Sequence, residues 1–379
     1  MRLFGSRVLR DAEEQAIRLE LELNRDPDAE RSAAFRTATE HSVTTTLVAL
    51  EEMRADIAAK RRLDSSAKSK LNHNQHVAAK LHYLRAMLCP TGTTDDEADL
   101  ASAVILLAPL PLHWRGGLPD GLTALVGAEI DVRAQLELSA RLLNAIQFDD
   151  RFLLVDALVT VQESVLASLP AAAPERPAVL SNLGLALVNR FRRGGLPADL
   201  DRAMPLHREA LALMPADGPD RAAVHGNIAN VLREQFHLHQ RIADLDEAIA
   251  EMRIAASADR PDVPIMLSNL CDALRARFEH TGKTEDLSQA VSIGRQAVAT
   301  TPPGHRNRSA ATYHLALALL HHSSHGGSVA AINQALALAE ESVECGGPLH
   351  PNHASHQVLL DSLRELAVEF PDKLRGTRR

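Results

Sequence analysis

Two residue positions recur along the second half of the chain with one shared spacing, and this repetition constrains the fold more than any other feature. The first position is occupied by Asn182, Asn227 and Asn269 and then by His314, at intervals of 45, 42 and 45 residues (227−182, 269−227, 314−269). The second is alanine each time and keeps the same three intervals, as Ala203, Ala248, Ala290 and Ala335. Two independent markers with one spacing predict an array of structural repeats.

Each repeat is predicted to be a pair of amphipathic helices. Apolar residues three or four apart lie on one side of a helix, because a helix has 3.6 residues per turn. The first helix of the clearest unit carries such a stripe in Leu180, Leu183, Gly184, Leu187 and Phe191, and the second in Leu200, Ala203, His207, Ala210 and Leu211. A pair this small cannot bury its apolar side alone, so neighbouring pairs must stack.

The turn between the two helices carries its own signals. Gly194 and Gly195 are suited to a turn that needs positive φ. An acidic residue near the start of the second helix predicts an N-terminal cap, at Asp199, Asp244 and Asp286. Glu247 and Gln289, three residues after the last two, would complete a capping box.

These units resemble the tetratricopeptide repeat. Leu183-Gly184 matches the Leu-Gly pair of that family, and Ala203, Ala210, Leu211 and Pro215 match its second-helix residues and closing proline. The third unit matches through Leu270, Ala290, Ala297, Val298 and Pro302. The units here are longer than the family's usual length of about 34 residues by about seven.

The resemblance implies an all-α, right-handed superhelical array of helix-turn-helix repeats, in which the first helices line the concave groove and hold extended peptides. The longer form is similar to a bacterial subgroup often fused to a caspase-like protease or a nucleotide-binding module. Neither module is recognisable in this sequence, so the resemblance implies an effector encoded nearby as one class of partner.

The domain organisation predicted from the sequence has four parts. They are a divergent N-terminal helical region (1–69), a degenerate repeat with a Pro/Gly-rich loop around Trp114 (70–132), the repeat array with a C-terminal capping helix (133–370), and a basic tail (371–379). The degenerate repeat is inferred because Leu84-Arg85-Ala86 precedes Thr91-Gly92 by the same seven residues that separate Leu274-Arg275-Ala276 from Thr281-Gly282.

Composition restricts the classes of partner and compartment. The net charge is −8 and aromatic residues make up 3% of the chain, which argues against a nucleic-acid surface. No apolar run reaches the roughly 20 residues of a membrane span, and the amino terminus lacks the apolar core of a signal peptide. Three widely separated cysteines indicate a reducing compartment. We therefore expect a cytoplasmic protein with no membrane partner and no cofactor.

The predicted binding surface consists of polar residues on the first helices. Asparagine suits a peptide backbone because its amide offers donors and an acceptor, and arginine can hold a carboxylate with two hydrogen bonds. The predicted partner-binding residues are Asn182, Asn227, Asn230, Arg233, Asn269, Asp272, Arg275 and His314. The structural alternative is that each asparagine bonds to a neighbouring helix within the stack and that the arginines form a solvated edge.

Other residues receive mainly structural interpretations. Phe191, Phe236 and Phe278 share one position at the end of the first helix and are predicted to be core, while Cys271 is predicted to be an inert buried thiol. The spacing of His350, His353 and His356 is compatible with a metal site. We favour surface or turn histidines over that site, and no catalytic motif occurs.

The sequence thus predicts a protein-interaction scaffold or regulator that binds a peptide or partner protein in the groove of the array. Two alternatives stay open. One is an enzyme that uses the helical repeats as a small-molecule pocket, with a His-ligated metal as one variant. The other is a self-associating structural module, and the oligomeric state is left open.

Overall fold

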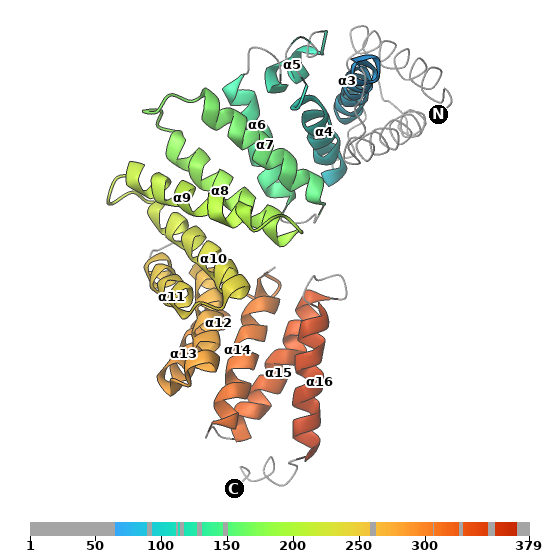
Figure 1. Ribbon diagram of the computed structural model, residues 1–379. Helices are drawn as coiled ribbons and strands as arrows, with labels where there is room; N and C mark the ends of the chain where they lie inside the picture. The colour runs from blue at the N-terminus through green and yellow to red at the C-terminus, as the bar shows by residue number, and fades with distance from the viewer. Residues whose placement is uncertain are drawn as a thin grey trace. The chain divides into compact units, whose positions relative to one another are not determined.

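The computed structural model describes residues 65–88, 93–110, 113, 117–126, 131–146, 151–257, 263–305, 307–325, 329–347 and 353–369. Every regular element in these ranges is a helix, as the sequence predicts (Figure 1). The chain divides into two compact units between Leu206 and His207. The four-part organisation expected from the sequence stays a prediction.

The first unit contains α3 (Ser65–Leu88), α4 (Thr94–Leu107), α5 (Asp120–Val126), α6 (Val132–Ala145), α7 (Phe152–Ser168), α8 (Arg176–Arg192) and the start of α9 (Ala198–Leu213). Helices α3 and α4 pack together, and His82 Nδ1 lies 2.9 Å from Asp99 Oδ1 between them. These two helices cover the sequence in which a degenerate repeat is predicted. Helices α6 and α7 form the next pair, with Ala157, Val161 and Val165 buried.

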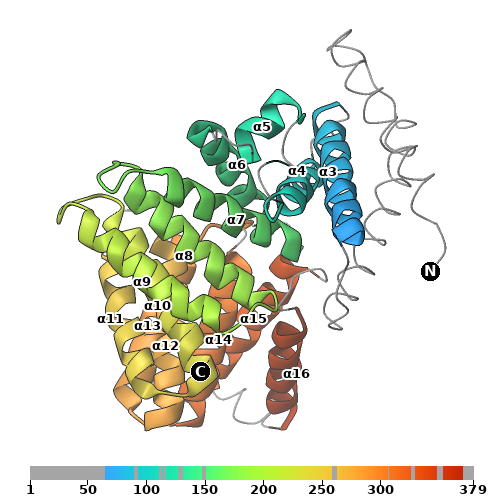
Figure 2. The same cartoon turned by 45° about the horizontal axis from the view of Figure 1, so that its top comes forward.

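The second unit continues with α10 (Arg221–His239), α11 (Ile242–Ala256), α12 (Val263–Thr281), α13 (Thr284–Thr300), α14 (Arg308–Ser324), α15 (Val329–Gly346) and α16 (His353–Glu369). Each helix packs on the next along the chain, and α12 also packs on α14. Figure 2 shows α14 beside α15 from a second direction. We call α8, α10, α12 and α14 the first helices, and α9, α11, α13 and α15 the second helices. A first helix and the second helix that follows it form one repeat.

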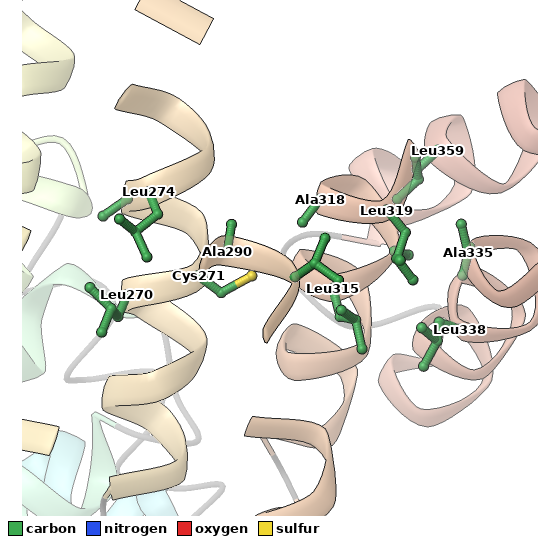
Figure 3. Packing of buried hydrophobic residues seen from close by; sticks show 14 of the residues in the cluster. Leu270, Cys271, Leu274, Ala290, Leu315, Ala318, Leu319, Ala335, Leu338 and Leu359 are labelled. Carbon is green, nitrogen blue, oxygen red and sulfur yellow. The ribbon is translucent and has the colours of Figure 1, made fainter. Parts of the chain in front are cut away.

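A continuous apolar core joins the helix pairs of the second unit. It is built mainly from alanine and leucine, which allow helices to approach closely. Figure 3 shows Leu270 and Cys271 of α12, Ala290 of α13, Leu315 of α14 and Leu338 of α15 in one packed layer. Of the three phenylalanines predicted to be core, Phe236 and Phe278 are buried, whereas Phe191 in the first unit is half-buried.

Helix α16, for which the sequence predicts a capping role, packs on α15. Leu359, Leu360 and Leu363 of α16 are buried in the core of the second unit. Asp361, Arg364 and Glu365 lie on its exposed side. Arg364 also bonds Glu340 of α15 at 3.2 Å.

The acidic caps predicted for the second helices are not formed. Helix α11 begins after Arg241 and α13 after Lys283, and neither residue caps its helix with a side chain. Asp244 and Asp286 lie one turn further in, and Asp286 accepts two hydrogen bonds from Arg277, of 2.8 and 2.5 Å. The capping-box prediction was wrong because a carboxylate in the first turn is bound more strongly by a nearby guanidinium than by a backbone amide.

The same ion pair occurs in the first unit. Arg190, at the end of α8, donates to Asp199 at 3.1 and 2.6 Å. It also donates to Asp156 of α7 at 2.9 Å. In the second unit Arg277 makes the corresponding contact with Asp246 at 2.8 Å. Each of these arginines joins the two helices of its own repeat to the helix before them, which is α7 for Arg190 and α11 for Arg277.

Three of the first helices begin with an arginine that bonds the end of the helix before it. Arg176, Arg221 and Arg308 stand six residues before Asn182, Asn227 and His314, respectively. Each donates from Nη1 to the last carbonyls of the second helix before it, such as Leu211 for Arg221 and Val298 for Arg308. A cation at a helix C-terminus satisfies carbonyls that have no partner within the helix. This position repeats, but it was not recognised in the sequence.

The turns after the first helices need left-handed backbone. Gly194 and Gly282 have φ values of 96° and 70°, as expected for glycine there. Gln240, at the position corresponding to Gly282, adopts φ of 55°. Its side-chain amide donates to the Phe236 carbonyl at 3.3 Å and its oxygen lies 2.9 Å from His280 Nε2, so local hydrogen bonds support the unusual conformation.

Several expectations fall outside the described residues. These are the N-terminal helices before residue 65, the loop residue Trp114, His350 and the basic tail. Among the helices that are described, none combines the length and the apolar character that a membrane crossing requires.

Candidate functional site

The candidate site lies on the first helices of the second unit. Five side chains from α10, α12 and α14 form a connected series of ion pairs, which we call the Asp272 network: Arg233, Asp272, Arg275, Glu279 and His321. Helical periodicity explains its local construction, because Asp272, Arg275 and Glu279 are three and four residues apart on one side of α12. Stacking of the first helices then adds Arg233 from α10 and His321 from α14.

Asp272 is the centre of the network. Its Oδ2 accepts from Arg233 at 3.0 Å and its Oδ1 from Arg275 at 2.8 Å. Burial by itself raises the pKa of Asp272, but the adjacent His314 imidazole and the Arg233 and Arg275 guanidinium groups lower it well below its usual range. Asp272 is therefore ionised at neutral pH and holds both arginines in place.

The outer end of the network is more exposed. Arg275 Nη1 contacts Glu279 Oε1 at 2.6 Å, and His321 Nε2 lies 3.0 Å from the same oxygen. The Glu279 side chain is 36% exposed, against 13% for Arg275. The hydrogen bond from His321 is the largest cause that lowers the pKa of Glu279, with a further contribution from Arg275.

His314 lies beside this network on α14. Its Nδ1 is 3.1 Å from the Ser268 carbonyl and 2.9 Å from the Ser268 hydroxyl. Because a carbonyl can only accept, Nδ1 carries a proton. Burial lowers the pKa of His314, and the nearby arginines lower it further against the opposing effect of Asp272. The imidazole is therefore neutral at pH 7, with the lone pair on Nε2.

The asparagines differ in their surroundings. Asn182, Asn227, Asn230 and Asn269 are all half-buried on first helices, Asn182 in the first unit and the others in the second. Within the described parts of the chain, the side chains of Asn182, Asn230 and Asn269 make no hydrogen bond. The structural alternative, a bond from each asparagine to a neighbouring helix, therefore does not apply to these three.

The structure thus brings together four of the predicted residues, namely Arg233, Asp272, Arg275 and His314, with Asn230 and Asn269 on the same helices. Sequence analysis missed Glu279 and Ser268. Glu279 follows Arg275 by four residues, which is a recognisable helical pair. Ser268 gives no comparable signal, because its contact with His314 depends on how α12 and α14 stack.

Of the three C-terminal histidines, the structure describes His353 and His356, and buried His356 differs from the surface or turn position predicted for it. His356 is buried, with Nδ1 3.1 Å from the Ser309 hydroxyl and its ring stacked on Tyr313 at 4.3 Å. His353 is half-buried at the start of α16, and His350 is outside the described residues. In the part of the chain that the structure describes, no group of three His, Cys, Asp or Glu side chains is placed to hold a metal ion.

Two other histidines pack against buried phenylalanines near the ends of the first helices. His280 packs edge-on against Phe236 at 5.0 Å, and His325 packs in the same way against Phe278 at 4.9 Å. Each ring nitrogen Nδ1 also bonds the carbonyl four residues earlier. Cys271 is fully buried, and burial raises the pKa of its thiol to about 12, so it is not a nucleophile at neutral pH.

A comparison of the chain with models of known protein families finds no match, and a comparison with curated proteins finds none either.

Proposed function

We propose that this protein is an interaction scaffold or regulator, and that the first helices of its second unit bind an extended segment of a partner protein. The helix pairs resemble tetratricopeptide repeats, and the proposal includes the right-handed superhelical arrangement of that family. In such an array the first helices line the concave side. The observation that carries the proposal is that Asn230 and Asn269 present amides without internal partners beside the Asp272 network.

The two asparagines suit the backbone of a bound segment. An extended peptide exposes one N–H and one C=O per residue, and a side-chain amide can pair with both. Asn230 and Asn269 stand on adjacent first helices, one turn from Arg233 and three residues from Asp272, respectively. Recognition would therefore depend on backbone geometry, with sequence preference supplied by the neighbouring charged groups.

The charged groups favour hydrogen bonding over attraction of a strongly charged partner. Two arginines and two carboxylates neutralise each other in the Asp272 network. Both terminal nitrogens of Arg275 are already bonded, to Asp272 and Glu279. Arg233 uses Nη2 on Asp272, which leaves the rest of its guanidinium available to a carbonyl or carboxylate of the partner. We expect Arg233, rather than Arg275, to contact the bound segment.

The test is selection of binding sequences from a phage library of random linear peptides on the immobilised full-length protein. An enriched peptide is then labelled, and its affinity is measured by fluorescence anisotropy. We expect the Asn230→Ala, Asn269→Ala double variant to lose affinity about 30-fold, because two hydrogen bonds contribute about 2 kcal/mol.

Asn333→Ala is the matched control, since Asn333 is an exposed asparagine on second helix α15. It should bind the peptide as wild type does. Failure to enrich any peptide, or equal affinity of wild type and the double variant, would contradict the proposal. Circular dichroism spectra must show that all variants keep their helical content.

A further inference from the structure

An open pocket of about 390 Å³ lies between α13, α14 and α15, in the second unit. Its apolar part is formed by Val291, Leu319 and Ala331. It shares no residue with the Asp272 network. A pocket of this size accommodates a small organic molecule.

Arg295 supplies the charge of this pocket, and its partner on the next second helix is an amide. The corresponding arginine two repeats earlier, Arg208, forms an ion pair with Glu247 at 3.1 Å. Arg295 instead donates to the amide oxygen of Gln334 at 3.2 Å. Gln334 stands at the position of Glu247, immediately before the repeated alanine. With an amide in place of the carboxylate, Arg295 has no negatively charged partner among the described residues.

Further donors line the same pocket. Ser292, Gln296 and His322 contribute a hydroxyl, an amide and an imidazole. As far as the structure describes the chain, none of these three side chains has a hydrogen-bond partner. No aspartate or glutamate is among the described residues that line the pocket. A site with one unneutralised cation, several unused donors and no carboxylate favours an anion.

We propose that this pocket binds a phosphate monoester of a small organic molecule. Arg295 is the cationic anchor of the phosphate group, and Ser292, Gln296 and His322 supply additional donors. The organic part packs on Val291, Leu319 and Ala331. A phosphate monoester fits better than a carboxylate because its three terminal oxygens can accept from several directions, whereas a carboxylate has two oxygens in one plane.

The probe for this proposal is phenyl phosphate, which combines a ring with a phosphate monoester. Binding to the full-length protein is measured by isothermal titration calorimetry at constant ionic strength, because salt screens exposed charges. We expect saturable binding with a Kd of about 1 mM or tighter, and weaker binding of benzoate. Absence of saturation by phenyl phosphate, or equal affinity for benzoate, would overturn the phosphate assignment.

Two variants locate the site. Arg295→Gln should weaken phenyl phosphate binding about tenfold or more, since it removes the charged donor. Gln334→Glu should also weaken it several-fold, because the new carboxylate would pair with Arg295 as Glu247 pairs with Arg208. This second variant adds an ion pair between neighbouring helices, so lost binding would not reflect unfolding.

Arg253→Gln is the matched control. Arg253 is an exposed arginine at the corresponding position one repeat earlier, and it also donates to a glutamine, Gln289, at 2.7 Å. It does not line the pocket. We expect its affinity for phenyl phosphate to stay within about twofold of wild type. An equal loss in Arg253→Gln and Arg295→Gln would show general charge attraction and overturn the proposed site.

Discussion

The first and second helices of the second unit use polar side chains in opposite ways. Along the second helices, one contact recurs between successive repeats: Arg208 with Glu247, Arg253 with Gln289, and Arg295 with Gln334. Each arginine lies five residues after the repeated alanine, and each partner lies one residue before the next one. Along the first helices, the contacts of Asp272, Glu279 and His314 each involve a different set of residues.

This difference separates the requirements of stacking from those of an individual site. A contact that recurs at three successive junctions satisfies a need that these repeats share, which is alignment of neighbouring helix pairs. Among the described helices the Asp272 network occurs at one place, and it holds several charges in a partly buried position. Such an arrangement is more typical of a site that binds another molecule. The following predictions test whether the two sets of contacts differ in energy as they differ in pattern.

The largest effect is expected for Asp272→Asn. The substitution removes the only charge that Arg233 and Arg275 share, and their side chains are 15% and 13% exposed. Arg233 would lose the carboxylate that the described residues place against it, and Arg275 would keep Glu279 alone, so the free energy of unfolding should fall by about 3 kcal/mol. Urea denaturation followed by circular dichroism measures this. A loss no larger than that of a substitution on the second helices would erase the energetic difference between the two surfaces.

A smaller effect concerns His207, which lies on the inner side of second helix α9. This side chain is fully buried, and burial lowers its pKa to about 4. The folded protein therefore keeps His207 neutral, while the unfolded chain takes up a proton below about pH 6.5. Stability is lost as the pH falls from about 6.5 towards 4, by about 2 kcal/mol between pH 7 and pH 5.

The His207→Leu variant should show a shallower decrease in unfolding free energy over that interval. His239→Leu serves as its control, because His239 is exposed and its removal should leave the pH dependence unchanged. Urea midpoints measured at a series of pH values test both variants. Identical slopes for wild type and His207→Leu would show that this histidine does not contribute to acid sensitivity.

The smallest effect is expected for Glu247→Gln. It converts the contact with Arg208 into the amide contact found at the next two junctions. The side chains of Arg208 and Glu247 are 60% and 45% exposed, so water screens their attraction. The free energy of unfolding should change by about 0.5 kcal/mol or less. A change of the size expected for Asp272→Asn would mean that the recurring contact is energetically important.

The repeated pattern predicted the helix pairs because it depends only on local periodicity. Apolar residues three and four apart gave the buried sides of α8 and α9, and Gly194 gave the turn between them. The acidic caps were predicted incorrectly at Asp244 and Asp286. Their local signal was real, but Arg277 was available to bind Asp286 only after the two helices had packed side by side.

The candidate site was predicted in part for the same reason. The sequence identified Asn230, Arg233, Asn269, Asp272 and Arg275 because they occupy corresponding sides of repeated helices. It did not show that Arg233 of α10 bonds Asp272 of α12, or that Ser268 orients His314. These contacts join residues that are up to 46 positions apart in the chain, so they follow from helix stacking and not from local spacing.

The sequence by itself determined the number of residues between equivalent positions, the type of helix pair and which side of each helix is apolar. These properties follow from the 3.6-residue period and from the need to bury apolar surface. Only the tertiary structure decided which charges neutralise each other. Arg233 and Arg295 are both arginines on repeated helices, yet Arg233 meets Asp272 of the next first helix and Arg295 faces an amide and an open pocket. Charge pairing acts over a few ångströms in space, and the stacking of the helices sets those distances.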